Sequence, residues 1–470
     1  MKRRDFLNYG VLAAVGGTVA SSTIAGCTTA VAKKAQGKTK NIIFMVSDGM
    51  STGTLNMADL LLQRKEGHGS NWINLYRNDR IKRALMDTAS ADSMVTDSAA
   101  GSSSWGGGYR VNNGSLNVAP DGTKHKPILQ KFKEAGKSVG CVTTVPITHA
   151  TPAGFAINAK SRGDQALIAE LYLPLHFDVM MGGGTEYFSA DKRKDGKDMY
   201  QEFAQNGYTV VRTKDEMKTA GSEKPVLGVF YEDGLPYSLD QKEDQELIAK
   251  IPTLAEMTQK TIDLLSKNSE GFVMQVEGGK VDWGAHSNDT GALLYDQIAF
   301  DEAVGVAIAF AEKRDDTLVI ITTDHGNANP GLIKSSQVDA KFDLIQNYKY
   351  TNEWILNNIR KNDSPARLIE QINHAQGYAI TTDEAKELLS HYADKDNAGL
   401  YNAYKLPFER LAEIQQNYTS VGWSGTNHSA DFVELTMFGQ GSELLKPFVK
   451  NIELHNLMLE AAGVEALVNA

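Results

Sequence analysis

Five short runs of apolar and β-branched residues recur along the chain. They occupy residues 41–46, 138–145, 177–183, 272–276 and 317–323. Helical spacing of apolar residues lies between several of them, for example at 126–136 and 254–268. A strand that is apolar throughout must be covered on both faces, as in parallel sheets flanked by helices. The sequence therefore predicts an α/β fold with a central, mostly parallel sheet sandwiched by helices.

The stretch from about 335 to 420 differs from the rest of the predicted domain, 41–470. It lacks strand-like runs and is rich in helix-forming residues. Thr381 and Glu384 have the spacing of a capping box, which marks the start of a helix. One face of a further helix is predicted to carry Phe408, Leu411 and Ile414. We expect this stretch to be a helical insertion on the α/β domain.

The N-terminal segment has the pattern of an export signal. Arg3 and Arg4 resemble a twin-arginine signal, and the apolar stretch after them ends in "TIAGC", which resembles a lipobox. On this interpretation residues 1–26 are removed, Cys27 carries a lipid, and 27–40 is a flexible tether. The expected location is the bacterial cell envelope, exported to the periplasm or cell surface and anchored to the membrane only by that lipid. An ordinary cleaved secretory signal is the alternative.

The overall charge restricts the partners. The 470-residue chain has a formal net charge of −10, so general binding to nucleic acid or to an anionic membrane is not expected. A small anionic substrate remains compatible with this charge, because local cations can reverse the field inside one cleft. Apart from Cys27 the only cysteine is Cys141, which lies in an apolar run and is expected to be a buried thiol.

Polar residues with metal-binding chemistry follow four of the predicted strands. The residues after these runs are Asp48, then His149 and Thr151, then Glu277, Asp282 and His286, and finally Asp324 and His325. The carboxyl ends of parallel strands meet at one edge of the sheet, where active sites of such folds lie. An aspartate after a strand is often only a turn or helix cap. Four strand ends with the same chemistry nevertheless favour a common site.

Carboxylates gathered at one edge would repel one another unless cations lie between them. Mixed histidine and carboxylate ligands suit zinc, and all-oxygen sets suit magnesium. We therefore expect a cluster of two or more divalent metals. Such clusters commonly catalyse hydrolysis or phosphoryl transfer.

Ser98, in "VTDSAAG", is a candidate nucleophile without a recognisable base motif around it. The segment is typical of a helix start, with Asp97 or Thr96 near the cap. A helix N-terminus suits a phosphate group, and a nearby metal could deprotonate the serine. The neighbouring serines 102–104 are interpreted as ordinary helix or turn residues.

Six motifs in the chain resemble the alkaline phosphatase family. They are "SDGM", "VTDSAAG", "HATPAGFAINAKSR", "QVEGGKVDWGAHSND", "TTDHGN" and "TNHSAD", which occur in the family's order between about residues 40 and 440. The resemblance implies that Ser98 is a nucleophile that becomes phosphorylated. It also implies that Arg162 grips two phosphate oxygens through its planar fork.

The same resemblance implies a ligand set for two zinc ions and one magnesium ion. The matching positions are Asp282, His286 and His428 for the first zinc, Asp48, Asp324 and His325 for the second, and Asp48, Thr151 and Glu277 for magnesium. His149 and Trp283 occupy positions that vary within the family. His149 makes the third site compatible with zinc as well. Trp283 is expected either to stack on a substrate, to orient His149 or a water, or simply to pack beside the site.

The implied activity is hydrolysis of small phosphate monoesters, with release of inorganic phosphate. A phosphodiesterase or sulfatase-type hydrolase of the same superfamily is an alternative, although "DSAAG" lacks the Pro and Arg of the sulfatase pattern C-x-P-x-R. A zinc-binding or phosphate-binding lipoprotein without turnover is a second alternative. Many relatives are homodimers, but no pairing surface can be recognised in the sequence.

Overall fold

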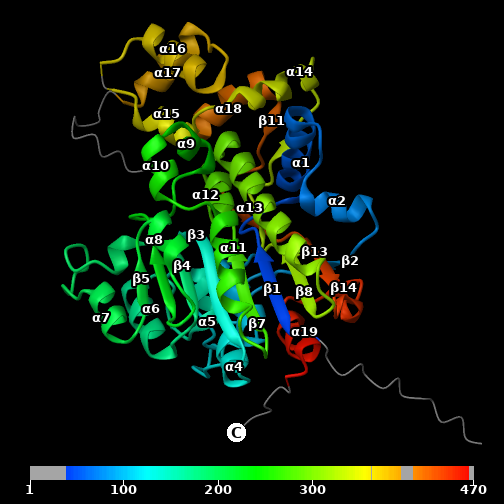
Figure 1. Cartoon of the computed structure of the whole chain (residues 1–470). Helices are drawn as coiled ribbons and strands as arrows, with labels where there is room; N and C mark the ends of the chain where they lie inside the picture. Colours follow the sequence, from blue (N-terminus) through cyan, green and yellow to red (C-terminus); the bar gives the residue numbers. More distant parts are fainter. Residues whose placement is uncertain (1–38, 361, 393–405, 465–470) are drawn as a thin grey trace, which may run out of the picture. The chain divides into compact units, whose positions relative to one another are not determined.

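The computed structural model of the chain describes residues 39–360, 362–392 and 406–464. The predicted signal segment, most of the tether and the lipidation site Cys27 lie outside the described residues. Within these ranges, one large sheet of ten strands has helices on both faces (Figure 1). No helix of the described ranges is both long enough and apolar enough to cross a bilayer. The predicted fold class, a mostly parallel α/β sheet sandwiched by helices, is confirmed.

The sheet is parallel except around one strand. From edge to edge it contains β14 (Phe448–Val449), β2 (Lys82–Met86), β13 (Val433–Gly439), β8 (Thr317–Thr322), β1 (Asn41–Val46), β7 (Phe272–Glu277), β3 (Ser138–Pro146), β4 (Val179–Gly183), β6 (Val226–Val229) and β5 (Thr209–Val211). β13 pairs antiparallel with both β8 and β2, and the other neighbouring pairs are parallel. β1 lies at the centre, between β8 and β7.

The apolar strands form two cores, one on each face of the sheet. In β1, Ile43 and Met45 belong to one core, whereas Ile42, Phe44 and Val46 belong to the other. Both faces are buried, which explains why this strand is apolar throughout and does not alternate with polar residues. The five predicted strands correspond to β1, β3, β4, β7 and β8, with end positions that differ by one or two residues.

Helices from two sets pack into these cores. The first core receives α1 (Thr52–Glu66), α2 (Asn71–Arg77), α8 (Lys214–Thr219), α9 (Ser238–Glu243), α10 (Gln245–Lys250), α11 (Leu254–Leu265), α12 (Lys280–His286) and α13 (Thr290–Ala311). The second core receives α3 (Ser98–Gly107), α4 (Ile128–Glu134), α5 (Ala150–Ala156), α6 (Gln165–Tyr172), α7 (Met199–Gln205) and α19 (Glu453–Ala462). The helices predicted at 126–136 and 254–268 are α4 and α11, and each is shorter than predicted.

The predicted helical insertion forms a group of helices that extends the first core (Figure 1). It contains α14 (Val338–Asp343), α15 (Asn352–Asn357), α16 (Pro365–Gln376), α17 (Thr382–Ser390) and α18 (Phe408–Thr419). Both halves of the predicted Thr381–Glu384 capping box are present at α17. Short antiparallel strands β10 (Gly331–Leu332) and β11 (Val421–Gly422) join the two ends of the insertion.

An ion pair between buried Asp59 and half-exposed Arg77 joins the first two helices of the fold. Burial tends to raise the pKa of Asp59, but hydrogen bonds from the Arg77 guanidinium and the Ser70 backbone N–H outweigh it and lower that pKa. Because the pKa of Asp59 is lower in the folded protein than in the unfolded chain, its ionised carboxylate stabilises the fold at pH values above the unfolded pKa. This stabilisation is lost as the pH falls through the folded pKa. We expect Asp59→Asn to reduce the free energy of unfolding at neutral pH by about 1–3 kcal/mol.

Thermal melts of the wild-type protein and this variant across a pH series would check the prediction. The difference in Tm should narrow as the pH falls from the ordinary pKa of an aspartate through the lowered pKa of Asp59, because protonation then removes the charge that binds Arg77. A difference that stays constant from neutral to acidic pH would show that the charge of Asp59 contributes nothing.

Candidate active site

The carboxyl ends of the central strands converge on one site, as the sequence predicts. Asp48 lies two residues after β1, and Glu277 is the last residue of β7. Asp324 and His325 lie two and three residues after the end of β8. Gly49 allows the first of these turns, because its φ is +65° and a Cβ there would lie 2.3 Å from a carboxylate oxygen of Asp282.

Ser98 opens α3 at the edge of this site, and its side chain is almost fully buried. Asp97 is the N-cap, and its carboxylate accepts a hydrogen bond from the Ala100 N–H at 2.9 Å. The predicted helix start is therefore confirmed. The Ser98 hydroxyl lies 3.5 Å from Nε2 of His325, so the candidate nucleophile faces the metal-type ligands. The hydroxyls of the three serines 102–104 bind backbone carbonyls, which confirms their structural interpretation.

Asp282, His286 and His428 form the first cluster of possible metal ligands. Nε2 of His286 is 3.3 Å from the Asp282 carboxylate and 3.1 Å from Nε2 of His428. The Nδ1 atoms of the two histidines lie 2.7 Å and 2.9 Å from the backbone carbonyls of Thr426 and Thr96. Since a carbonyl only accepts, each Nδ1 carries the proton, and each Nε2 presents its lone pair to the cluster.

A short strand pair places His428 in this cluster although it is distant in sequence. β12 (His428–Ser429) pairs antiparallel with β9 (Gly326–Asn327), directly after His325. The rings of His325 and His428 stack with centroids 3.6 Å apart. The first cluster therefore lies beside the second.

Asp48, Asp324 and His325 are the predicted second set. Asp324 lies beside His325, but the group of possible metal ligands that contains Asp48 and His325 has Asp282 as its third member. Nε2 of His325 is 3.2 Å from Asp324 and 3.7 Å from Asp48. The remaining Asp324 oxygen, Oδ1, accepts the backbone N–H of Gly49 at 3.1 Å. At most about 1% of the surface of each of these three residues is exposed.

The predicted third set, Asp48, Thr151 and Glu277, forms the other end of the site. The Thr151 hydroxyl donates to Asp48 Oδ2 at 3.1 Å, and His149 supplies a ring nitrogen close to Asp48 and Glu277. Asp48 therefore borders two clusters at once. Replacing Asp48 would therefore disturb both clusters.

The electrostatics of the site call for cations. Four fully buried carboxylate oxygens have no hydrogen-bond partner within the described part of the chain, namely Asp48 Oδ1, Asp324 Oδ2 and both oxygens of Glu277. Burial and the charges of Asp324 and Asp282 raise the pKa of Asp48 well above its usual range. Burial, with a contribution from the Asp324 charge, raises the pKa of Glu277 to about 7. Buried carboxylate oxygens without hydrogen-bond donors, together with imidazole nitrogens that present lone pairs, are suitable ligands for divalent cations.

Arg162 lies between Asp97 and His149. Its Nη1 donates to Asp97 Oδ2 and its Nη2 to Nε2 of His149, both at 3.0 Å. Burial and the Arg162 charge lower the pKa of His149 to about 3, so the ring is neutral and can accept this bond. Trp283 meets His149 edge-on, with ring centroids 6.2 Å apart. Of the alternatives for Trp283, this contact supports packing beside His149.

Two residues of the site were absent from the predicted set. Asp97 was considered only as a helix cap, yet its second oxygen holds Arg162 and the Gly114 backbone N–H. Asn327 donates from its amide to Asp282 Oδ1 at 2.7 Å. Its place in the "TTDHGN" motif, two residues after His325, is the signal that could have identified it.

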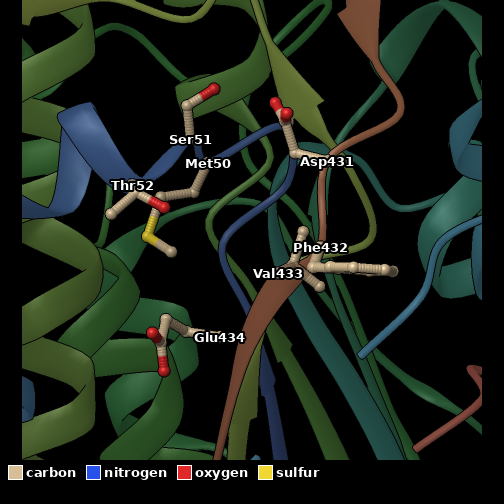
Figure 2. Close-up of a pocket in the computed structure, with 8 residues that line it drawn as sticks. Met50, Ser51, Thr52, Asp431, Phe432, Val433 and Glu434 are labelled. Atoms are coloured by element: carbon tan, nitrogen blue, oxygen red, sulfur yellow. The ribbon is translucent and has the colours of Figure 1, made fainter. Parts of the chain in front are cut away.

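Figure 2 shows a small pocket beside the site, and none of its lining residues belongs to a group of possible metal ligands among the described residues. Its lining residues are Met50, Ser51, Thr52, Gly326, Asp431, Phe432, Val433 and Glu434. Both of its carboxylates already have partners among the described residues: Asp431 accepts from Ser429 at 2.7 Å, and Glu434 accepts from Tyr76 at 2.9 Å. Among the residues that the structure describes, the groups of possible metal ligands are the three clusters of the site.

Comparison with known proteins agrees with this geometry. The family model for alkaline phosphatase matches residues 39–464. Alkaline phosphatase 4 of Bacillus subtilis is 30% identical over 437 residues, covering 91% of this chain and 90% of its own. Streptomycin-6-phosphate phosphatase of Streptomyces griseus is 29% identical, covering 65% of this chain and 78% of its own.

Among solved structures, Thermus thermophilus alkaline phosphatase superposes with a TM-score of 0.83 at 31% identity. The match covers 95% of this chain and 96% of the Thermus chain. The family match, the relatives and the fold agree over almost the whole described structure. The chain belongs to the alkaline phosphatase family and is a phosphatase of the hydrolase class.

Proposed function

We propose that this phosphatase hydrolyses small phosphate monoesters by way of a phosphorylated Ser98. The observation that carries the proposal is the position of the Ser98 hydroxyl. It opens a helix, faces His325 at 3.5 Å, and belongs to a site in which several buried carboxylate oxygens have no hydrogen-bond donor among the described residues. A helix N-terminus suits the phosphate, and cation ligands suit activation of the hydroxyl.

The family is metal-dependent, and the donor sets of this chain fit the metals that the sequence predicts. Asp282, His286 and His428 would hold one zinc, and Asp48, Asp324 and His325 a second. Asp48, Thr151 and Glu277 would hold magnesium, and His149 makes zinc an alternative there. When bound, these cations supply Lewis-acid chemistry that favours the ionised serine and the departing oxygen.

The chain's own residues do the remaining work. Ser98 Oγ attacks phosphorus in line, the ester oxygen leaves, and water later hydrolyses the phosphoserine to release phosphate. Arg162 contributes two donors in a fixed fork, which match two oxygens of a phosphate. Asp97 and His149 hold that fork at its present place by one hydrogen bond each, so the guanidinium is oriented before substrate arrives.

Two observations favour monoesters over diesters. A monoester presents an additional negatively charged oxygen, and the Arg162 guanidinium offers positive charge to balance it, as would a cation held by the third cluster. The Streptomyces griseus relative is named for a small phosphate ester.

The test compares a chromogenic phosphate monoester with the matching diester. We expect the protein, supplied with zinc and magnesium, to cleave the monoester far faster than the diester and fastest at alkaline pH. Trapping with acid during turnover should yield labelled phosphoserine at position 98. A metal-replete protein that hydrolyses no monoester from mildly acidic to strongly alkaline pH would disprove the proposal, and a preference for the diester would redirect it.

A further inference from the structure

Lys280 is a buried cation whose closest partners are aromatic rings. It opens α12, two residues before Asp282, and only 5% of its surface is exposed. Its ammonium lies 3.6 Å from the ring centroid of Tyr237 and 4.5 Å from that of Trp283. Among the described residues it forms no hydrogen bond or ion pair through that ammonium. The two ring faces therefore hold a charge that is costly to bury.

Carboxylates around the stack keep this cation in place. Burial raises the pKa of Asp233, Asp240 and Asp296, and the Lys280 charge opposes the rise in each case. Asp296 in turn accepts the backbone N–H of Ser238, next to Tyr237. The cation is thus attracted to the loop and helix that carry the Tyr237 ring.

Trp283 lies between the Lys280 ammonium and the backbone at Gly234. A Cβ at position 234 would lie 2.9 Å from the indole ring, so Gly234 allows its backbone to pack directly on Trp283. The other neighbour of the indole is His149, met edge-on. His149 accepts from Arg162, and Arg162 donates to Asp97, the cap of the Ser98 helix.

We propose that Lys280 is a positioning residue for phosphate binding. Held between Tyr237 and Trp283, its ammonium fixes the indole that supports the ring of His149, and that ring holds one arm of the Arg162 fork. The inference rests on the proposed function, because it assigns Arg162 to the phosphate. This role predicts that the charge of Lys280 affects the affinity for phosphate although the Lys280 side chain does not contact phosphate.

The first experiment replaces Lys280 by methionine, which keeps the length of the side chain and removes its charge. The expected result is a rise of about fivefold in both KM for the monoester and the inhibition constant of inorganic phosphate. The kcat should change less than about twofold, because Ser98 and the metal ligands are untouched. Lys280→Arg, which retains a cation over the rings, should restore most of the affinity.

A double-mutant cycle tests the route through the indole. In a Trp283→Leu background, Lys280→Met should have little further effect on KM, because the ring that transmits the position is gone. Lys65→Met is the matched control, since Lys65 also lies over a tyrosine ring, 4.8 Å from the Tyr295 centroid, but belongs to the end of α1. This control should leave KM unchanged.

The outcomes separate this inference from the proposed function. If the wild-type protein hydrolyses the monoester while Lys280→Met leaves KM and phosphate inhibition unchanged, the positioning role is wrong and the function stands. A fall in kcat with KM unchanged would also overturn it. Calorimetric binding of inorganic phosphate to the metal-loaded proteins gives the same comparison without turnover, and melting curves show whether each variant is folded.

Discussion

Ser98→Ala is expected to reduce kcat for a phosphate monoester by about 10³-fold or more, because it removes the attacking oxygen. No other hydroxyl of α3 can replace it. The neighbouring serines bind the carbonyls of Ala99, Ala100, Ala150 and Ser115 and point away from the clusters of ligands. Residual turnover would come from water acting at the remaining site.

The measurement is kcat under saturating substrate, together with the metal content and Tm of the variant. Metal content and Tm should stay close to wild type, since the carboxylate and imidazole ligands of the clusters are unchanged. Ser104→Ala is the matched control: it removes a buried hydroxyl from the same helix, bound at 3.0 Å to the Ala100 carbonyl, and should retain activity. An active Ser98→Ala enzyme with normal metal content would rule out the serine as nucleophile.

Removing divalent metal with a chelator is expected to abolish activity and to lower stability. A cation present at a concentration of about a hundred times its Kd stabilises the folded state by about 2.7 kcal/mol, and its removal takes this stabilisation away. Loss also leaves the buried, partnerless oxygens of Asp48, Asp324 and Glu277 facing one another. Activity and Tm should return when zinc and magnesium are added together.

Glu277→Gln sharpens this prediction because its effect should reverse sign with metal. In the metal-free protein the variant should melt above wild type, since it removes one of several repelling buried charges. In the loaded protein it should melt below wild type, since it removes a ligand charge. Melting curves of both proteins with and without metal give the four values. A variant that melts below wild type both with and without metal would show that charge repulsion at Glu277 does not destabilise the metal-free protein.

Much of the fold was predictable because its signals are local. In β1 all six residues from Asn41 to Val46 are buried, and the five apolar ones pack into the two cores, which the apolar run shows directly. The same is true of the capping box at Thr381 and the cap at Asp97, where the partners lie within three residues. Strands toward the edges of the sheet were missed: β2, which lies next to the edge strand β14, carries exposed Lys82, Arg83 and Leu85, so its run does not look like a buried strand.

The site was predictable to a different degree. The identities of its ligands follow from their places after apolar strands and from the family motifs. Their mutual geometry does not follow in the same way. The approach of His428 to His325 depends on two-residue strands that no periodicity announces. The dual role of Asp97, as cap and as partner of Arg162, depends on a contact across 65 residues.

The sequence alone thus determined the class of fold and the chemistry of the ligands, because apolar periodicity, caps and strand-end residues act over a few positions. Only the tertiary structure decided how those ligands divide into clusters around Ser98. It also decided that β13 reverses direction in the sheet and that Lys280 lies between two rings. These features arise from contacts between segments far apart in the chain, where packing and charge, rather than local conformation, select the arrangement.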